Sequence, residues 1–351
     1  MSSNSNIRVP LQGLGVKYKS INLPFTHPFT ISKGTKTHQP ALIVELEHFG
    51  NKGYGEAPAI VHYNITVDEM IADIERKKTF IEKFAFTHPD RFWHYLHHLF
   101  PNDPFLVCAL DMAGWDLYGK ISGRQLYKLW NLDLGKNPLT DFTIGIDTVE
   151  KMVEKMKEKP WPIYKIKLGT EDDVRIISEL RKHTTSIFRI DANAAWQANE
   201  ALEKINIFKN LGVEFIEQPL AKDDWDGMKF LFENSPLPLI ADESCVAESD
   251  VEKCAGFFHG INIKLTKCSG ITPALRMITK ARELNMKVMV GCMNESSIGS
   301  SAIAQLLPLL DYVDMDGPLL LSQDVGDGVK FEDGKIIYRG LNGIGVSVEP
   351  F

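Results

Sequence analysis

Short apolar runs that recur at a nearly constant interval constrain the fold of this chain more than any other feature. Each run ends in a polar residue, and the polar ends of the first five runs are 22 to 26 positions apart, which is about the length of a strand, a helix and two loops. The runs are Tyr164 to Lys167, Ile187 to Asp191, Val213 to Glu217, Pro238 to Asp242, Ile261 to Lys264, Val288 to Cys292 and Tyr312 to Asp314. Because strands that alternate with helices form parallel sheets, seven or eight such units predict a closed (β/α) barrel.

The first part of the chain follows a different pattern, in which extended segments precede helices. Residues 16–22, 29–32 and 41–48 are predicted strands, since they are rich in β-forming residues and lie between turn signals. A helix is expected to begin at Thr66, because a glutamate three residues later completes a capping box. A second helix is expected over residues 104–120. These elements predict an α+β domain in front of the barrel.

The two patterns divide the chain into three expected parts. They are an N-terminal α+β domain over residues 1–130, a (β/α) barrel over 131–325, and a C-terminal segment over 326–351. The last segment is β-rich and is expected to return to the N-terminal domain. The histidines of residues 94–98 have no partner ligands elsewhere in the sequence pattern, so we expect a helix surface there and assign it no role.

Charge and cysteine content exclude several classes of partner. Lys and Arg number 39 against 46 Asp and Glu, and a net charge of -7 gives no attraction for nucleic acid or anionic membranes. The most apolar stretch is too short to cross a bilayer. Five cysteines, an odd number without a C-x-x-C pair, argue against a disulfide framework or a structural zinc site. We therefore expect a cytoplasmic homo-oligomer that binds neither nucleic acid nor membrane.

Three carboxylates end successive runs of the predicted barrel. Asp191, Glu217 and Asp242 would meet at the mouth formed by the C-terminal ends of the strands. Such a group repels itself strongly unless a cation neutralises it, and all-oxygen ligands favour Mg²⁺ over zinc. We expect one Mg²⁺ per subunit at these residues; a structural ion pair is the less favoured alternative.

Lysines lie on both sides of the carboxylates. Lys165 and Lys167 leave the same face of one strand, and Lys264 ends a strand across the barrel. Neighbouring ammonium groups and a divalent cation are expected to lower a lysine pKa towards neutrality. Opposed lysines beside a metal suit removal of a proton α to a carboxylate through a metal-stabilised enediolate. Racemisation or epimerisation fits best, although β-elimination and cycloisomerisation share the intermediate, and strand-end lysines can also be merely solvated.

Six short motifs, in order and at barrel spacing, resemble the muconate-lactonizing-enzyme subgroup of the enolase superfamily over almost the whole chain. They are Ala109 to Ala113 with Trp115 to Leu117, Lys165 to Gly169, Asp191 to Asn193, Glu217 to Pro219, Ala241 to Ser244 and Asn262 to Lys264. The resemblance implies an enolase-like modified TIM barrel, (β/α)7β, with an N-terminal α+β capping domain. It implies that Lys167 and Lys264 are the acid/base pair and that Asp191, Glu217 and Asp242 hold Mg²⁺.

Within the subgroup, Asp314-Met315-Asp316 resembles the D-x-D motif of dipeptide epimerases. Two aspartates on one strand face suit the α-ammonium group of a dipeptide, which a muconate or succinylbenzoate substrate lacks. The implied activity is epimerisation of L-Ala-L-Xaa to L-Ala-D-Xaa by two-lysine 1,1-proton transfer. The other residues that we expect at the substrate, or in support of it, are Thr143, Lys165, Cys292, Asn193, Met293 and Glu295.

One departure from Ala-Glu epimerases concerns the second residue of the dipeptide. Those enzymes carry an arginine in a loop of the capping domain, whereas residues 30–40 here contain Lys33, Gly34, Lys36 and His38 but no arginine. We therefore expect an apolar or broad second residue, with Lys33 or Lys36 as a weaker point charge for an acidic one. The alternatives are a strict L-Ala-D/L-Glu epimerase, and o-succinylbenzoate synthase or muconate cycloisomerase on the same scaffold.

Overall fold

The capping domain begins with a three-stranded antiparallel sheet. The computed structural model describes residues 13–31 and 34–349, and the sheet has the order β1-β2-β3, with bounds Gly15–Ile31, Gly34–His48 and Asn51–Pro58. The segment predicted at 16–22 and residues 29–31 of the segment predicted at 29–32 belong to the single long strand β1, whose register with β2 shifts between Pro24 and Phe29. Residue 32 lies outside the described residues. This long hairpin is why a strand prediction from local pattern was too short.

Three helices cover this sheet. They are α1 (Val67–Glu82), α2 (Pro89–Leu99) and α3 (Pro104–Ile121). Thr66 caps α1 as expected, and its side chain accepts a hydrogen bond from the Glu69 N–H. Helix α3 packs closely on β3: a Cβ on Gly55 would lie 1.9 Å from the Ala109 carbonyl oxygen, so only glycine fits there. The sheet and helices share a buried apolar cluster drawn from residues 14–117.

Eight parallel strands form the predicted barrel. Their order is that of the sequence, and a bridge between Thr140 and Val313 joins the two edges. The strands are β4 (Phe142–Ile144), β5 (Ile163–Lys167), β6 (Ile187–Asp191), β7 (Val213–Glu217), β8 (Leu239–Ala241), β9 (Gly260–Lys264), β10 (Lys287–Gly291) and β11 (Tyr312–Asp314). These bounds match the seven apolar runs to within one residue at each end, and β4 adds the eighth strand.

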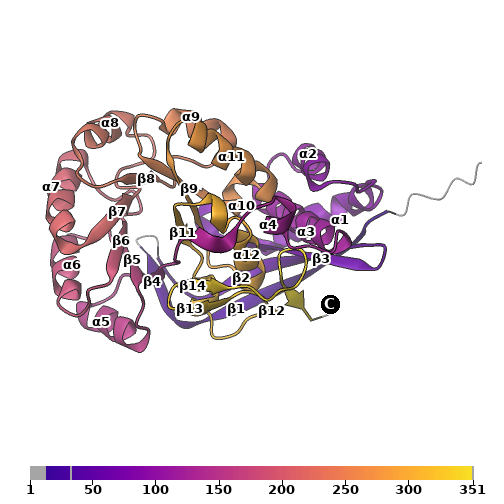
Figure 1. The fold of residues 1–351 in the computed structure, drawn as a ribbon, viewed down its shortest axis with the longest axis horizontal. Coiled ribbons are helices and arrows are strands. Elements are labelled where there is room, and N and C mark those ends of the chain that lie inside the picture. The colour runs from indigo at the N-terminus through magenta and orange to yellow at the C-terminus, as the bar shows by residue number, and fades with distance from the viewer. Residues whose placement is uncertain (1–12, 32–33, 350–351) are drawn as a thin grey trace, which may run out of the picture.

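Helices surround the barrel on the outside, whereas the capping domain lies to one side of it (Figure 1). The helices between the strands are α5 (Val149–Glu158), α6 (Asp173–Arg181), α7 (Ala198–Phe208), α8 (Trp225–Asn234), α9 (Val251–Cys254), α10 (Leu265–Cys268), α11 (Ile271–Glu283) and α12 (Ser297–Ala304). Short α4 (Leu126–Leu129) precedes the barrel, and α13 (Gly317–Leu320) follows its last strand. No helix within residues 13–31 and 34–349 has the length and apolar character needed to cross a membrane.

The C-terminal segment contacts both parts of the molecule. It contains two small antiparallel pairs, β12 (Gly326–Asp327) with β15 (Ser347–Val348) and β13 (Lys330–Glu332) with β14 (Lys335–Ile337). The Ile344 N–H donates to Asp116 on α3 at 2.9 Å, and the Ile344 carbonyl accepts from Gln305 beside α12 at 2.9 Å. The boundaries at residues 130 and 325 remain predictions.

Buried polar contacts join the capping domain to the barrel. Asp111 on α3 accepts hydrogen bonds from the Thr272 N–H at 2.9 Å and the Thr272 hydroxyl at 2.7 Å. Glu56 on β3 accepts from the backbone N–H and the hydroxyl of Ser296, which caps α12. These contacts fix the capping sheet over the end of the barrel where the polar strand ends meet.

Candidate active site

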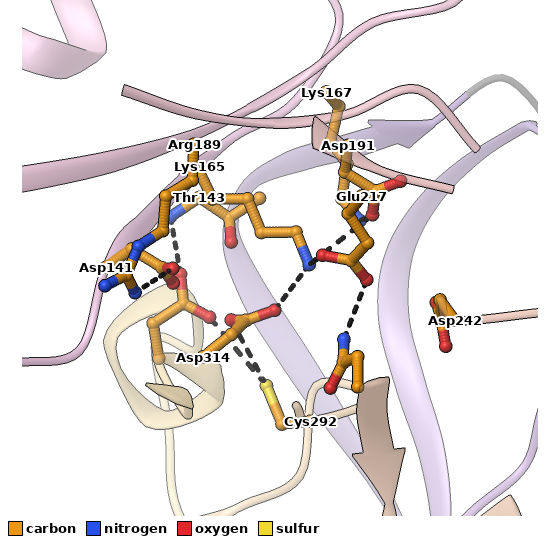
Figure 2. A network of polar contacts seen from close by, with 12 residues as sticks. Asp141, Thr143, Lys165, Lys167, Arg189, Asp191, Glu217, Asp242, Cys292 and Asp314 are labelled. Carbon is orange, nitrogen blue, oxygen red and sulfur yellow. Dashed lines mark hydrogen bonds and ion pairs between the residues drawn. The ribbon is translucent and has the colours of Figure 1, made fainter. Parts of the chain in front are cut away.

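Three buried carboxylates gather at the C-terminal end of the barrel strands. Asp191 ends β6, Glu217 ends β7, and Asp242 directly follows β8, so the parallel register brings the three side chains to one level. One oxygen from each lies within 4.8 Å of the others, and all three residues are buried. Figure 2 shows them facing the same space.

The donor set fits Mg²⁺. All three ligands are carboxylate oxygens, the type that this ion prefers, and the site offers no cysteine or histidine among them. Burial, together with the charge of Asp191, raises the pKa of Glu217, which shows how poorly the group tolerates a further negative charge. Asn262 on β9 orients Glu217 by donating from Nδ2 to Oε1 at 2.7 Å.

Lys165 lies beneath these carboxylates and is fully buried. Its Nζ lies 3.4 Å from Asp191 Oδ2, 2.7 Å from Glu217 Oε2 and 2.7 Å from Asp314 Oδ2 (Figure 2). Burial alone lowers a lysine pKa, but these carboxylates outweigh it and raise the pKa of Lys165 well above its ordinary value. Lys165 is not among the residues that line the cavity, and its contacts suit a counter-charge below the three carboxylates; its expected contact with the substrate stays a prediction.

Lys167 and Lys264 approach the carboxylates from opposite sides. Lys167 ends β5 and lies 2.6 Å from Asp191 Oδ2, whereas Lys264 ends β9 and lies 3.7 Å from Asp242 Oδ2. Three strands, β6 to β8, separate them in the sheet, yet both side chains line the same cavity. The Lys264 ammonium also donates to the Cys292 carbonyl at 3.1 Å.

The expected lowering of lysine pKa values concerns the site with its metal bound; in the protein alone, carboxylates act in the opposite direction on Lys165 and Lys264. Burial lowers the pKa of Lys264, but the charge of Asp242 outweighs burial and the net pKa is raised. The sequence-based expectation considered only the effects of neighbouring ammonium groups and of the metal on the lysine pKa. It could not show that each of these lysines directly contacts a carboxylate, which stabilises its charged form.

The D-x-D aspartates form a second acidic group in the same cavity. Asp314 ends β11, and Asp316 accepts a hydrogen bond from the Thr143 N–H of β4 at 2.6 Å. The Cys292 sulfur lies 4.0 Å from Asp314 Oδ1 and 3.8 Å from Asp316 Oδ1. Burial and the neighbouring Asp314 charge raise the pKa of Asp316 to about 7, whereas Lys165 and Lys264 overcome burial and hold the pKa of Asp314 well below its usual range.

The remaining expected residues lie around this cavity. The Asn193 backbone, at a φ of 45°, donates to Asp191 Oδ1 at 2.9 Å, and its side chain lines the cavity. Met293 also lines the cavity and donates its N–H to Glu295. Glu295 is buried beside the cavity, and burial raises its pKa to about 7. Thr143 and Cys292 also line the cavity on the barrel side, together with Glu243 and Asn294.

Sequence reasoning missed most of the cavity wall that the capping domain supplies. Those lining residues are Phe29, Ile31, Lys36, Ile60 and Tyr63. Of these only Lys36 was considered, and Lys33 lies outside the described residues. Capping strands carry ordinary apolar patterns, so nothing local in the sequence marks these side chains as parts of a site.

Lys267, shortly after β9, also contacts a metal-binding carboxylate. It is buried one turn after Lys264 and contacts Asp242 through both the carboxylate and the backbone carbonyl, the latter at 3.3 Å. Its ammonium lies 5.7 Å from the centre of the Tyr63 ring. Lys267 therefore contacts Oδ1 of Asp242, whereas Lys264 lies near its Oδ2. Its position on the turn after β9 could have suggested a site residue, but not its partner.

The histidines of residues 94–98 lie on α2, away from this cavity. The His97 ring stacks on Trp93 with centroids 4.9 Å apart, and Trp93 donates its indole N–H to the Ser269 carbonyl. Within the described ranges, neither group of residues able to hold a metal ion includes a histidine. The segment lies on α2, with His97 packed against Trp93.

Comparisons with known proteins agree with this arrangement. Residues 147–351 match the family described as "Enolase C-terminal domain-like". The chain is 52% identical to the L-Ala-D/L-amino acid epimerase of Flavobacterium johnsoniae, over 94% of this chain and 98% of that protein. It is 54% identical to the L-Ala-D/L-amino acid epimerase of a Maribacter species, over 95% and 99%.

A solved structure of a dipeptide epimerase from Cytophaga hutchinsonii, complexed with Mg and the dipeptide D-Ala-L-Val, superposes with a TM-score of 0.89 at 26% identity, covering 96% of each chain. The substrate complex of the L-Ala-D/L-Glu epimerase from Bacillus subtilis has a TM-score of 0.89 at 28% identity, over 95% of this chain and 98% of that one. The chain therefore belongs to the enolase superfamily, among its isomerases of amino-acid derivatives.

Proposed function

We propose that this chain epimerises the second residue of L-Ala-containing dipeptides, converting L-Ala-L-Xaa to L-Ala-D-Xaa and back. The observation that carries the proposal is the placement of Lys167 and Lys264 on opposite sides of one cavity, with the D-x-D pair in the same cavity. Two proton-transferring groups on opposite faces are what inversion at a single carbon requires. The names of the relatives support a dipeptide as substrate.

Asp191, Glu217 and Asp242 would hold Mg²⁺, because their carboxylates lie at one level and supply only oxygen ligands, which suit this ion. Bound there, the ion supplies electrostatic stabilisation of the negative charge that develops on the substrate carboxylate when the α-proton leaves. Lys165 and Lys267 keep the carboxylates in place from below and from the side. Their fixed charges reduce the repulsion among the three ligands.

Lys167 and Lys264 would share the proton transfer. One lysine, in its neutral form, takes the α-proton from one face of the substrate, and the ammonium of the other delivers a proton to the opposite face. The α-carbon is thereby inverted with no net gain or loss of protons, and the roles exchange in the reverse direction. A contact at 2.6 Å with Asp191 anchors the Lys167 Nζ, and a contact at 3.1 Å with the Cys292 carbonyl anchors the Lys264 Nζ.

Asp314 and Asp316 would bind the α-ammonium group of the dipeptide. The Thr143 N–H fixes Asp316, and Lys165 fixes Asp314, so the pair is already oriented. This pair favours a dipeptide over a muconate or succinylbenzoate substrate, because neither of those carries a cation. The Cys292 sulfur contacts both aspartates and so limits the space beside the pair, which favours a small first residue such as alanine.

Solvent-deuterium incorporation tests the proposal directly. The chain is incubated with Mg²⁺ in deuterated water with a panel of L-Ala-L-Xaa dipeptides, including L-Ala-L-Glu, L-Ala-L-Leu and L-Ala-L-Phe. We expect α-deuterium and the L-Ala-D-Xaa product for several of them, with the apolar dipeptides matching or exceeding L-Ala-L-Glu, and loss of both signals after chelation. Turnover of a succinylbenzoate precursor with none of any dipeptide would contradict the proposal.

A further inference from the structure

Asp173 is a buried carboxylate that the proposed mechanism does not use. It is the first residue of α6, its side chain is fully buried, and it is not among the residues that line the cavity. Its Oδ1 accepts from the N–H groups of Gly169 at 3.1 Å and Thr170 at 2.9 Å, and from the Thr170 hydroxyl at 2.9 Å. One oxygen of Asp173 therefore holds the loop that follows Lys167, the last residue of β5.

The other oxygen of Asp173 holds the next loop of the barrel. Oδ2 accepts from Trp196 Nε1 at 2.7 Å and from Lys204 Nζ at 3.0 Å. Trp196 is buried and lies in the loop between β6 and α7, which follows the metal-binding Asp191. Asp173 therefore joins the loops after Lys167 and Asp191, two residues whose side chains are themselves in contact at 2.6 Å.

The chemistry of this position requires a carboxylate. Within the described residues, the hydrogen bonds to the Asp173 side chain come from backbone N–H groups, a hydroxyl, an indole N–H and an ammonium, all of which are donors. A carboxylate only accepts, and its two oxygens have room for about four such bonds. An amide in its place would direct an N–H group at other donors, whichever way it were turned.

Lys167 depends on this contact more than Lys264 does. Directly after Lys167, the Leu168 N–H still donates to the Asp191 carbonyl at 2.9 Å, but the chain then turns away from β5 at Gly169, whose φ is 117°. Glycine populates many backbone conformations, so the hydrogen bond to Asp173 selects this one. Lys264 instead leads straight from β9 into α10, whose own hydrogen bonds fix the chain.

We propose that Asp173 is a positioning residue for Lys167, which it keeps on one face of the substrate α-carbon by holding the loops after β5 and β6 together. The inference rests on the proposed epimerase function. It predicts an asymmetric effect, because β9 and α10 hold the lysine of the other face. Loss of the Asp173 contacts slows proton transfer at the face of Lys167, whereas a general disturbance of the barrel slows it at both faces.

The test measures the initial rate of α-deuterium exchange of L-Ala-L-Leu and of L-Ala-D-Leu, separately, in deuterated water with Mg²⁺. Lys167→Ala identifies the diastereomer that Lys167 deprotonates, since its exchange is lost. In Asp173→Asn we expect exchange of that diastereomer to fall about tenfold to a hundredfold, because a displacement of about 1 Å has an effect of this size. Exchange of the other diastereomer should stay near the wild-type rate, whereas epimerisation, which needs both lysines, should fall in both directions.

Thr170 offers variants that leave the buried carboxylate in place. Thr170→Val removes the hydroxyl that donates to Asp173 and should slow the Lys167-dependent exchange about threefold to tenfold. Thr170→Ser keeps the hydroxyl and should keep the wild-type rate. Thr184→Val is the matched control: it removes a hydroxyl that donates to Ser186 beyond the other end of α6, and should change neither exchange rate. A Mg²⁺-dependent rise in melting temperature shows that each variant keeps its metal site.

The outcomes separate the two proposals. Equal slowing of both diastereomers, or slowing of neither, would overturn the positioning role of Asp173 and leave the proposed function standing. If Asp173→Asn does not fold, Thr170→Val decides by the same criterion: selective slowing supports the role, and equal slowing or none overturns it. If the wild type exchanges the α-proton of no dipeptide, the proposed function fails, and the inference on Asp173 fails with it.

Discussion

Lys165 shows how one side chain sets the charge balance of the candidate site. Fully buried, it contacts carboxylates from both acidic groups, since Asp191 and Glu217 belong to the metal-binding set and Asp314 to the D-x-D pair. A buried ammonium with three carboxylate partners is stable only because each charge offsets another. It therefore couples the two acidic groups, and its replacement by an apolar residue would remove a positive charge that both of them share.

At the residue scale, Asp316 predicts a pH dependence. Burial and the Asp314 charge raise its pKa to about 7, so below that pH the carboxyl is neutral and binds an ammonium group less well. We expect kcat/KM for a dipeptide to fall about tenfold per pH unit as the pH drops below about 7. The check is a pH–rate profile of the wild type and of Asp316→Asn.

The variant identifies the group responsible for this profile. Asp316→Asn should have a lower kcat/KM throughout and should lose the inflection near neutral pH. An inflection that persists in the variant would assign it to another group, such as Glu295, whose pKa burial also raises to about 7. In that case the role given to Asp316 in the pH dependence is wrong.

At the residue scale, the sequence predicts which residues belong to the candidate site better than it predicts what those residues contact. Strand-end positions identified Asp191, Glu217, Asp242 and both opposed lysines, because a buried run ending in a charged residue is visible in the pattern. The sequence could not predict that the Lys165 side chain lies below the carboxylates, whereas the Lys167 side chain, on the same strand face, lines the cavity. That difference depends on which neighbouring strands supply carboxylates at each level, and is a tertiary property.

At the element scale, the barrel strands were predicted almost to the residue. Runs such as Ile187–Asp191 and Val213–Glu217 are buried on both faces, so their apolar stretches coincide with the strands themselves. The capping hairpin was predicted less well. Strand β1 continues through Pro24 to Pro28, where polar and proline residues interrupt the pattern, because pairing with β2 sustains it on both sides of the register shift.

Strand β3 and helix α12 meet through Glu56, which predicts a loss of stability. The Glu56 carboxylate accepts from the N–H groups of Ser296 at 2.9 Å and Gly299 at 3.0 Å, in the first turn of α12. Glu56→Ala leaves these buried donors without an acceptor, and we expect the free energy of unfolding to fall by about 1–3 kcal/mol. Urea denaturation measures it.

Two further variants test whether the loss of stability comes from the Glu56 hydrogen bonds. Glu56→Gln keeps the volume and one acceptor oxygen, so it should lose less than Glu56→Ala. Glu154→Ala, an exposed glutamate on α5, serves as the control and should stay within about 0.5 kcal/mol of the wild type. Equal stability of Glu56→Ala and the control would show that the capping sheet does not depend on this contact.

At the scale of the whole molecule, the cavity exists only where the two domains meet. The barrel supplies the carboxylates, the lysines and the D-x-D pair, whereas the capping domain supplies Phe29, Ile31, Lys36 and Ile60. These two groups are more than a hundred residues apart in the sequence, so no local pattern links them. The chemistry was therefore predictable from strand ends, and the wall facing the second side chain was not.

The proposed epimerisation depends on two lysines that act on opposite faces of one carbon. The measurement that tests it most directly is α-deuterium exchange of L-Ala-L-Leu and L-Ala-D-Leu, each presented separately to Lys167→Ala and Lys264→Ala. Lys182→Ala, an exposed lysine beyond α6, is the control, and a Mg²⁺-dependent rise in melting temperature shows that each variant keeps its metal site.

The account predicts that neither variant epimerises either dipeptide, because inversion needs both groups. Each variant should still exchange the α-proton of one diastereomer, since a single base suffices for exchange, and the two variants should exchange opposite diastereomers. Epimerisation at the normal rate by either variant, or exchange of the same diastereomer by both, would contradict the placement of Lys167 and Lys264 on opposite faces.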